Sequence, residues 1–282
     1  MGERLRRPKK QRSRGMPTIP LCVLSLIGLG CLSGGFFLAG DAAYMDLYHA
    51  QEAPGRAFWF GTDSMGRDVF SMIWYGGRVS LEIGVLSMGI STGLGILIGA
   101  ASGLAPKWLD AGLMRMTELF LSVPGLLWIV LLRGALGGAD VAGLSFVIGM
   151  TGWAEIAKVV RTETRQLREK EYILAAQCMG AGFWRILWSH LAPNFMPSVL
   201  FMAVMNLRGA IGAEATLSFM GLGLPLEVVS WGSMLSLSER AMLTGSWWMI
   251  VIPGGFLVVT LLCVTEAGDW LRERGNRKKS YL

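Results

Sequence analysis

The residues that could carry covalent chemistry in this chain form no recognised catalytic or metal-binding pattern. Cysteine and histidine are the common zinc ligands, and cysteine forms disulfides. In this chain they are Cys22, Cys31, Cys178, Cys263, His49 and His190. No two cysteines stand at CxxC spacing, so we expect no metal site and no disulfide framework. The chain also lacks a GxxxxGK[ST] phosphate loop and any GxSxG or HExxH sequence. We therefore expect a non-catalytic chain that binds no cofactor or ATP of its own.

Charged residues that interrupt apolar runs are the second kind of chemically informative residue. They are Arg115, Glu118, Glu155, Lys158, Arg208 and Glu214. Charges are costly in lipid and usually face a bundle interior or water. The spacings predict two i,i+3 pairs, Arg115 with Glu118 and Glu155 with Lys158, although snorkelling near a membrane surface would also explain all four.

Three polar residues of the run from about Pro197 to Phe219 lie deeper in it. Arg208 and Glu214 are separated by about 120° around a helix, so a direct pair between them is not favoured. We hypothesise that Asn206, Arg208 or Glu214 lines a pathway through the membrane or bonds a partner subunit.

The elements that position these residues are predicted to be membrane helices. Of 282 residues, 52% are hydrophobic and only 16% charged, too few charges for a soluble surface. A span needs about 20 apolar residues, and we predict an all-α membrane protein with six spans. These are residues 19–39, 81–104, 113–132, 141–160, 197–219 and 248–264, with the first retained rather than cleaved as a signal peptide.

The basic residues predict the orientation of the chain. They gather in the first 14 residues, in the loop after the fourth span and in the C-terminal tail, whereas the segments 41–77 and 221–247 hold few. Six spans with both termini in the cytoplasm satisfy all of these segments, so the net charge of +6 indicates topology rather than nucleic-acid binding. We divide the chain into a basic tail (1–18), a first span (19–40), an external segment (41–80), a five-helix core (81–267) and a second basic tail (268–282).

The loop from Glu171 to Asn194, within a longer cytoplasmic segment (162–194), is too long for a simple turn. Helical spacing predicts a short helix that Gly180 and Gly182 end, and a second from Phe183 to Leu191. We expect its exposed apolar residues to rest either on lipid or on a cytosolic protein; they are Phe183, Trp184, Ile186, Leu187 and Trp188.

This loop resembles the EAA loop of binding-protein-dependent ABC importer permeases. Ala175, Ala176, Gly180 and Pro193 match its pattern, whereas Leu174 replaces the usual glutamate and Ala192 the usual leucine. The resemblance implies a coupling helix, from Ala175 to Arg185, that sits in a cleft of a separate ATPase. The residues implied in coupling are Glu171, Ala175, Ala176, Gly180, Ala181, Trp184, Arg185 and Pro193.

Three further motifs narrow the resemblance. The sequence GTDSMGRDVFSMIWYGGRVSLEIG, from Gly61 to Gly84, is similar to that of dipeptide, oligopeptide and nickel permeases, and Glu214–Leu235 and Gly268–Arg274 match further along. Within this family, the last two motifs resemble those of the C subunits, the DppC-like and OppC-like permeases. The external motif residues are Gly61, Thr62, Asp63, Gly66, Arg67, Asp68 and Arg78. The motif would form either a rim for the solute-binding protein or a structural cap, and Asp68–Val79 is compatible with an amphipathic helix on the outer face.

The resemblance implies a type I ABC importer permease (MetI-like) fold in the inner membrane. Expected partners are a second homologous permease, two ABC ATPases that bind ATP-Mg, an extracytoplasmic solute-binding protein and membrane lipid, but no nucleic acid. Peptides are the favoured substrates, with nickel or metal chelates as the alternative. A stand-alone channel or secondary transporter would leave the loop from Glu171 to Asn194 unexplained, and a membrane enzyme would lack a catalytic constellation.

Overall fold

The computed structural model describes residues 16–37, 44–137, 140–225, 227–238, 241 and 244–279. Most of the predicted N-terminal tail, the end of the first predicted span and the last three residues lie outside this part of the chain. The described residues form helices joined by short loops, and no strand longer than an isolated bridge occurs among them. The all-α prediction is confirmed.

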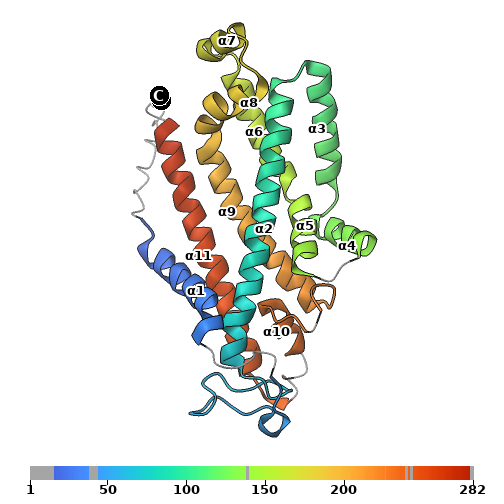
Figure 1. Cartoon of the computed structure of the whole chain (residues 1–282), viewed down its shortest axis with the longest axis vertical. Helices are drawn as coiled ribbons and strands as arrows, with labels where there is room; N and C mark the ends of the chain where they lie inside the picture. Colours follow the sequence, from blue (N-terminus) through green and yellow to red (C-terminus); the bar gives the residue numbers. More distant parts are fainter. Residues whose placement is uncertain are drawn as a thin grey trace, which may run out of the picture.

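The helices form an elongated bundle with two distinct ends (Figure 1). Helices α7, α8 and the start of α3 gather at one end, and the segment 44–68 and α10 lie at the other. The helices are α1 (Thr18–Phe37), α2 (Val69–Leu104), α3 (Lys107–Ser122), α4 (Gly125–Leu136), α5 (Val141–Thr151), α6 (Trp153–Leu167), α7 (Glu171–Cys178), α8 (Phe183–Ile186), a π-helical turn (Leu187–Leu191), α9 (Ala192–Phe219), α10 (Trp231–Leu237) and α11 (Trp248–Lys279).

Three described helical stretches are long and apolar enough to cross a membrane: 69–104, 183–219 and 248–275. Two bent pairs, α3 with α4 and α5 with α6, raise the number to five if each pair is one span. The apolar part of α1 that passes the same composition test, Thr18–Gly34, is shorter than a full span. The sixth span therefore stays a prediction.

Helix α2 is the centre of the bundle, and glycines let α6 approach its backbone. A Cβ atom at Gly95, Gly99 or Gly103 would lie within 2.6 Å of an atom of α6. By contrast, a Cβ atom at Gly89 or Gly93 would meet nothing within 4 Å. Three of these glycines therefore face α6 and form a glycine seam between the two helices, whereas Gly89 and Gly93 lie outside it.

Two of the predicted spans are broken rather than straight. At Pro124 the third predicted span is divided in two: α3 ends at Ser122, and α4 starts after Pro124 at 93° to it. The fourth span breaks at Gly152, where α5 and α6 meet at 43°. Proline cannot donate the helical hydrogen bond, and backbone groups freed in a membrane must find other partners. Helix α11, by contrast, continues unbroken through Pro253.

Helix α2 also corrects one prediction for the outer face. The stretch Asp68–Val79 is not a separate surface helix, because α2 begins at Val69 and runs without a break to Leu104. Asp68 caps this helix by accepting hydrogen bonds from the backbone N–H groups of Phe70 and Ser71. Its Gly76 and Gly77 pack against the start of α10 and against α1, which keeps this segment inside the bundle.

Candidate functional site

The loop between α6 and α9 is a compact two-helix unit. Helix α7 ends in a Schellman motif: Gly180 has φ +78°, its N–H bonds the carbonyl of Gln177, and the N–H of Ala181 bonds the carbonyl of Ala176. A side chain at Gly180 would strain this left-handed conformation, although space is available for it. The predicted break between the two helices is confirmed at this turn.

The inner face of this unit is apolar and packed. Ile173 and Ala176 of α7 are buried, as are Ile186 and Leu187 after the turn. The prediction that Ile186 and Leu187 are exposed is therefore wrong: with Ile173 they share a cluster that fixes the loop to α2, α6 and α9. Periodicity alone could not separate the two faces of so short a helix.

The outer face of the unit is apolar too, but exposed. We call it the coupling patch and define it as Tyr172, Leu174, Met179, Trp184 and Trp188, all of them exposed. Of the residues implied in coupling, Glu171, Ala175, Gly180, Trp184, Arg185 and Pro193 are exposed as well, Ala181 is partly buried and Ala176 is buried. An exposed cluster of this kind is typical of an interaction surface.

The second predicted loop helix, Phe183–Leu191, is not a separate element. It continues into α9 through the π-helical turn, where the N–H of Ala192 bonds the carbonyl of Leu187. Pro193 follows directly; it has no N–H to donate, and its ring crowds the preceding turn. The wider turn accommodates this proline. The loop and the long helix α9 are therefore mechanically continuous.

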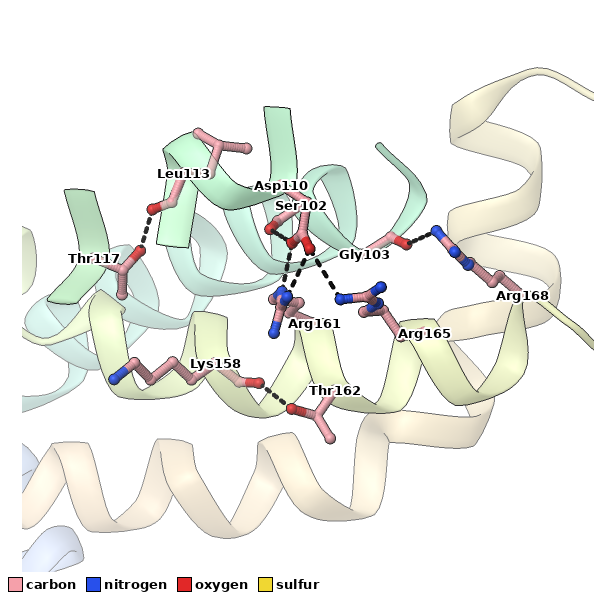
Figure 2. A network of polar contacts seen from close by, with 10 residues as sticks. All are labelled: Ser102, Gly103, Asp110, Leu113, Thr117, Lys158, Arg161, Thr162, Arg165 and Arg168. Carbon is pink, nitrogen blue, oxygen red and sulfur yellow. Dashed lines mark hydrogen bonds and ion pairs between the residues drawn. The ribbon is translucent and has the colours of Figure 1, made fainter. Parts of the chain in front are cut away.

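A cluster of charges joins α3 to α6 at the same end of the molecule (Figure 2). The carboxylate of Asp110 accepts hydrogen bonds from Nε and Nη2 of Arg161, at 2.5 and 2.6 Å, and from Nη1 of Arg165 at 3.0 Å. Ser102 of α2 donates to the same carboxylate at 2.6 Å. Arg168 donates to the carbonyl of Gly103 at 3.1 Å. Sequence reasoning missed Asp110, because its partners lie some fifty residues further along the chain.

We expect Asp110→Ala to loosen α3 from α6. Asp110 is 5% exposed, but the side chains of Arg161 and Arg165 are 24% and 38% exposed, so solvent screens the charges left behind and the cost should be about 1 to 2 kcal/mol, below that of a fully buried pair. The matched control is Glu118→Ala, which breaks the exposed pair with Arg115 at 3.1 Å and should cost under about 0.5 kcal/mol. Thermal unfolding midpoints in detergent measure both, and equal shifts would contradict the cluster's role.

The external motif forms a tightly bonded cap around the start of α2. Gly61, Thr62, Asp63, Gly66 and Arg67 are buried, and Nε of Arg67 donates to Oδ2 of Asp63 at 2.6 Å. The carboxylate of Asp63 also accepts from the backbone N–H groups of Met65 and Arg67. These contacts are those of a structural cap, whereas Asp68 caps α2 and Arg78 is exposed.

Hydrogen bonds connect this cap to α11 and to the residues that precede it in the chain. Trp248 of α11 donates from Nε1 to the carbonyl of Thr62 at 3.1 Å. The Oγ1 of Thr62 donates to the carbonyl of His49 and accepts from the N–H of Glu52. At the surface, the hydrogen bond between Asp46 and His49 raises the pKa of the imidazole and lowers the pKa of the carboxyl group.

A cavity of about 480 Å³ lies where the two broken spans meet α9. Its wall includes the bend at Pro124, the break at Gly152, and Asn206 of α9. Asn206 donates to the carbonyl of Gly152 at 2.9 Å, so it satisfies the backbone at the break. A Cβ atom at position 152 would lie 2.5 Å from the amide nitrogen of Asn206, which explains the glycine. The hypothesised residue Asn206 thus lines a cavity.

The other two hypothesised residues lie outside this cavity wall. Glu214 is fully buried, and its carboxyl group accepts hydrogen bonds from Ser80, Ser218 and Ser230 at 2.9, 2.9 and 2.7 Å. It therefore connects α9 to α2 and to the capping residue of α10. Arg208 is exposed on α9, with Nη1 3.5 Å from Oγ1 of Thr265 in α11.

The two predicted i,i+3 pairs differ. Arg115 and Glu118 form an ion pair at 3.1 Å, which confirms the first. Glu155 and Lys158 form no ion pair in the structure, where both residues are described, so the second prediction is wrong. Glu155 instead faces the cavity at the first turn of α6.

Comparison with known proteins places this architecture in a family. Residues 95–274 match the model of the binding-protein-dependent transport system inner membrane component. The chain is 35% identical over 262 residues to the oligopeptide transport system permease protein OppC of Bacillus subtilis, covering 93% of this chain and 85% of the relative. It is 32% identical over 253 residues to the dipeptide transport system permease protein DppC of the same organism, covering 90% and 79%.

A solved structure confirms the fold independently. The chain resembles one in the inward-facing structure of the MetNI methionine ABC transporter, with a TM-score of 0.56 and 17% identity over 72% of this chain and 96% of the other. The matched family model covers both broken spans, the loop and α9. The chain is therefore a membrane-embedded permease that belongs to the family of binding-protein-dependent transport system inner membrane components.

Proposed function

We propose that this chain is a transmembrane subunit of an ATP-driven importer of dipeptides or oligopeptides. The observation that carries the proposal is the similarity to OppC and DppC over most of the chain. A peptide permease of Brucella suis, named as putative and 37% identical over 81% of this chain, supports the same substrate class. These relatives favour peptides over the nickel alternative.

The loop between α6 and α9 is the part of this chain that would receive force from an ATPase. Its outer face presents two exposed tryptophans, and its inner face is packed into the bundle. The continuous helix from Phe183 to Phe219 would carry a movement of the loop to Asn206 at the cavity. Coupling requires that the loop binds one ATPase state better than another.

The partners follow from this arrangement. Two ABC ATPases bind and hydrolyse ATP-Mg, one on the loop of this chain and one on that of a second, homologous permease. A solute-binding protein delivers peptide at the opposite end, where Tyr48 and Trp59 are exposed next to the buried cap. The basic loop that contains Arg165 and Arg185 faces the cytoplasm. Both termini do so too, including the basic tail that contains Arg272. This chain performs no covalent step.

Reconstitution tests the proposal directly. The chain is purified with its partner permease and ATPases, placed in liposomes, and supplied with the binding protein and radiolabelled trialanine on the external side. We expect uptake that requires both ATP and the binding protein. Uptake of nickel but not of peptide, or peptide uptake without ATPases, would overturn the assignment.

A further inference from the structure

The cavity at the two helix breaks contains a charged side chain without a partner in the described part of the chain. Among the described residues that line it, Glu155 is the only ionisable one. Its side chain is exposed to the cavity and has no hydrogen-bond or ion-pair partner in the described part of the chain, although Lys158 follows one turn later. Helix α6 begins at Trp153, so this carboxylate lies near the middle of the bent pair α5–α6. Charges at such depth usually mark the path of a solute.

The other polar groups of the wall are occupied within the chain. Asn206 bonds the carbonyl of Gly152, Thr151 donates from Oγ1 to the carbonyl of Ile148, and Trp128 donates from Nε1 to the carbonyl of Phe120. Much of the remaining surface is apolar or aromatic, with the rings of Phe120 and Trp128 stacked at 4.8 Å. Among the described residues of the wall, a solute that enters the cavity therefore meets one ionisable side chain, the carboxylate of Glu155.

We propose that the central cavity binds the ammonium group of a peptide, with Glu155 as its counter-charge. This inference rests on the proposed function, because it concerns how the transported peptide is held. The volume of about 480 Å³ lies in the usual range of small-ligand sites. The described lining offers a carboxylate for the amino end of a peptide and no cation for its carboxyl end, so the peptide is held by its amino end.

A cysteine reporter tests the charge of the cavity. Thr151→Cys is introduced into the assembled transporter after Cys22 and Cys178, the two exposed native cysteines, are replaced by serine. We expect a trimethylammonium thiosulfonate to modify this cysteine about tenfold faster than a sulfonate reagent, because one nearby charge changes the local potential by this order. Glu155→Gln should remove the preference, whereas Glu155→Asp should keep it. The matched control Glu118→Gln, on the exposed pair of α3, should leave it unchanged.

Protection by peptides tests what the cavity binds. Saturating dialanine should slow modification of the reporter about threefold or more, which corresponds to at least two-thirds occupancy. N-acetyl-dialanine, which has no ammonium group, should not protect. N-acetyl-lysyl-alanine shows whether a side-chain ammonium substitutes for the amino terminus.

The outcomes separate the two proposals. Loss of both the reagent preference and the dialanine protection in Glu155→Gln supports the inference. It is overturned if dialanine protects this variant as well as the parent, or if the parent shows no preference between the reagents. ATP-dependent trialanine uptake by the parent is measured alongside; a cation-selective cavity without such uptake would count against the peptide assignment instead.

Discussion

Trp184→Ala is expected to release the ATPase subunits from the permease. Trp184 is 59% exposed on the coupling patch, while its neighbours Ile186 and Leu187 are buried and hold the loop in place. Exposed tryptophans that fill a partner's cleft are frequent hot spots, and their truncation costs about 2 to 4 kcal/mol of binding. We therefore expect at least about a thirtyfold loss of affinity, measured as loss of ATPase co-purification and of ATP-dependent uptake.

Trp108 provides the matched control for this substitution. It is 75% exposed near the start of α3, at the same end of the molecule but outside the loop. Trp108→Ala should leave the ATPases bound. If the patch instead rests on lipid, both variants will keep their ATPases, and the proposed coupling contact will be wrong.

Gly99→Val is expected to have the largest effect on stability of any change in the glycine seam. A Cβ atom at Gly99 would lie 2.5 Å from the carbonyl oxygen of Ala157 and 2.8 Å from Cβ of Val160. Neither atom can move without separating α2 from α6, because one is backbone and the other is fixed to it. Such overpacking costs about 3 kcal/mol, so we expect a markedly lower thermal midpoint and less folded protein in the membrane.

Gly89→Val isolates the contribution of the contact. The same side chain is added to the same helix, but a Cβ atom at Gly89 meets nothing within 4 Å in this chain. Any general effect of valine on a helix therefore cancels in the comparison. We expect a change under about 0.5 kcal/mol, and a loss equal to that of Gly99→Val would show that the α2–α6 seam is not the cause.

The sequence by itself determined that the helices lie in lipid, that the protein is an all-α membrane protein, and which family it resembles. Apolar runs of membrane length require lipid, and the distribution of arginine and lysine predicts which loops share a side. The turn at Gly180 was also predictable, because a left-handed residue at a helix end is a local property that glycine signals. The motifs from Gly61 to Arg274 resembled one family, which the family model and the relatives confirmed, and the solved structure shares the fold.

Only the tertiary structure decided which residues meet across long stretches of chain. The carboxylate of Asp110 accepts a hydrogen bond from Arg161, and that of Glu214 accepts one from Ser80. Helical periodicity cannot predict contacts between residues so far apart in the sequence. The same holds for the cavity, since its wall forms only when two broken spans pack beside α9. Sequence spacing suggested that Glu155 pairs with Lys158, but packing turned its carboxylate toward the cavity instead. Local chemistry fixed the elements, whereas their packing in three dimensions fixed the partners of each charge.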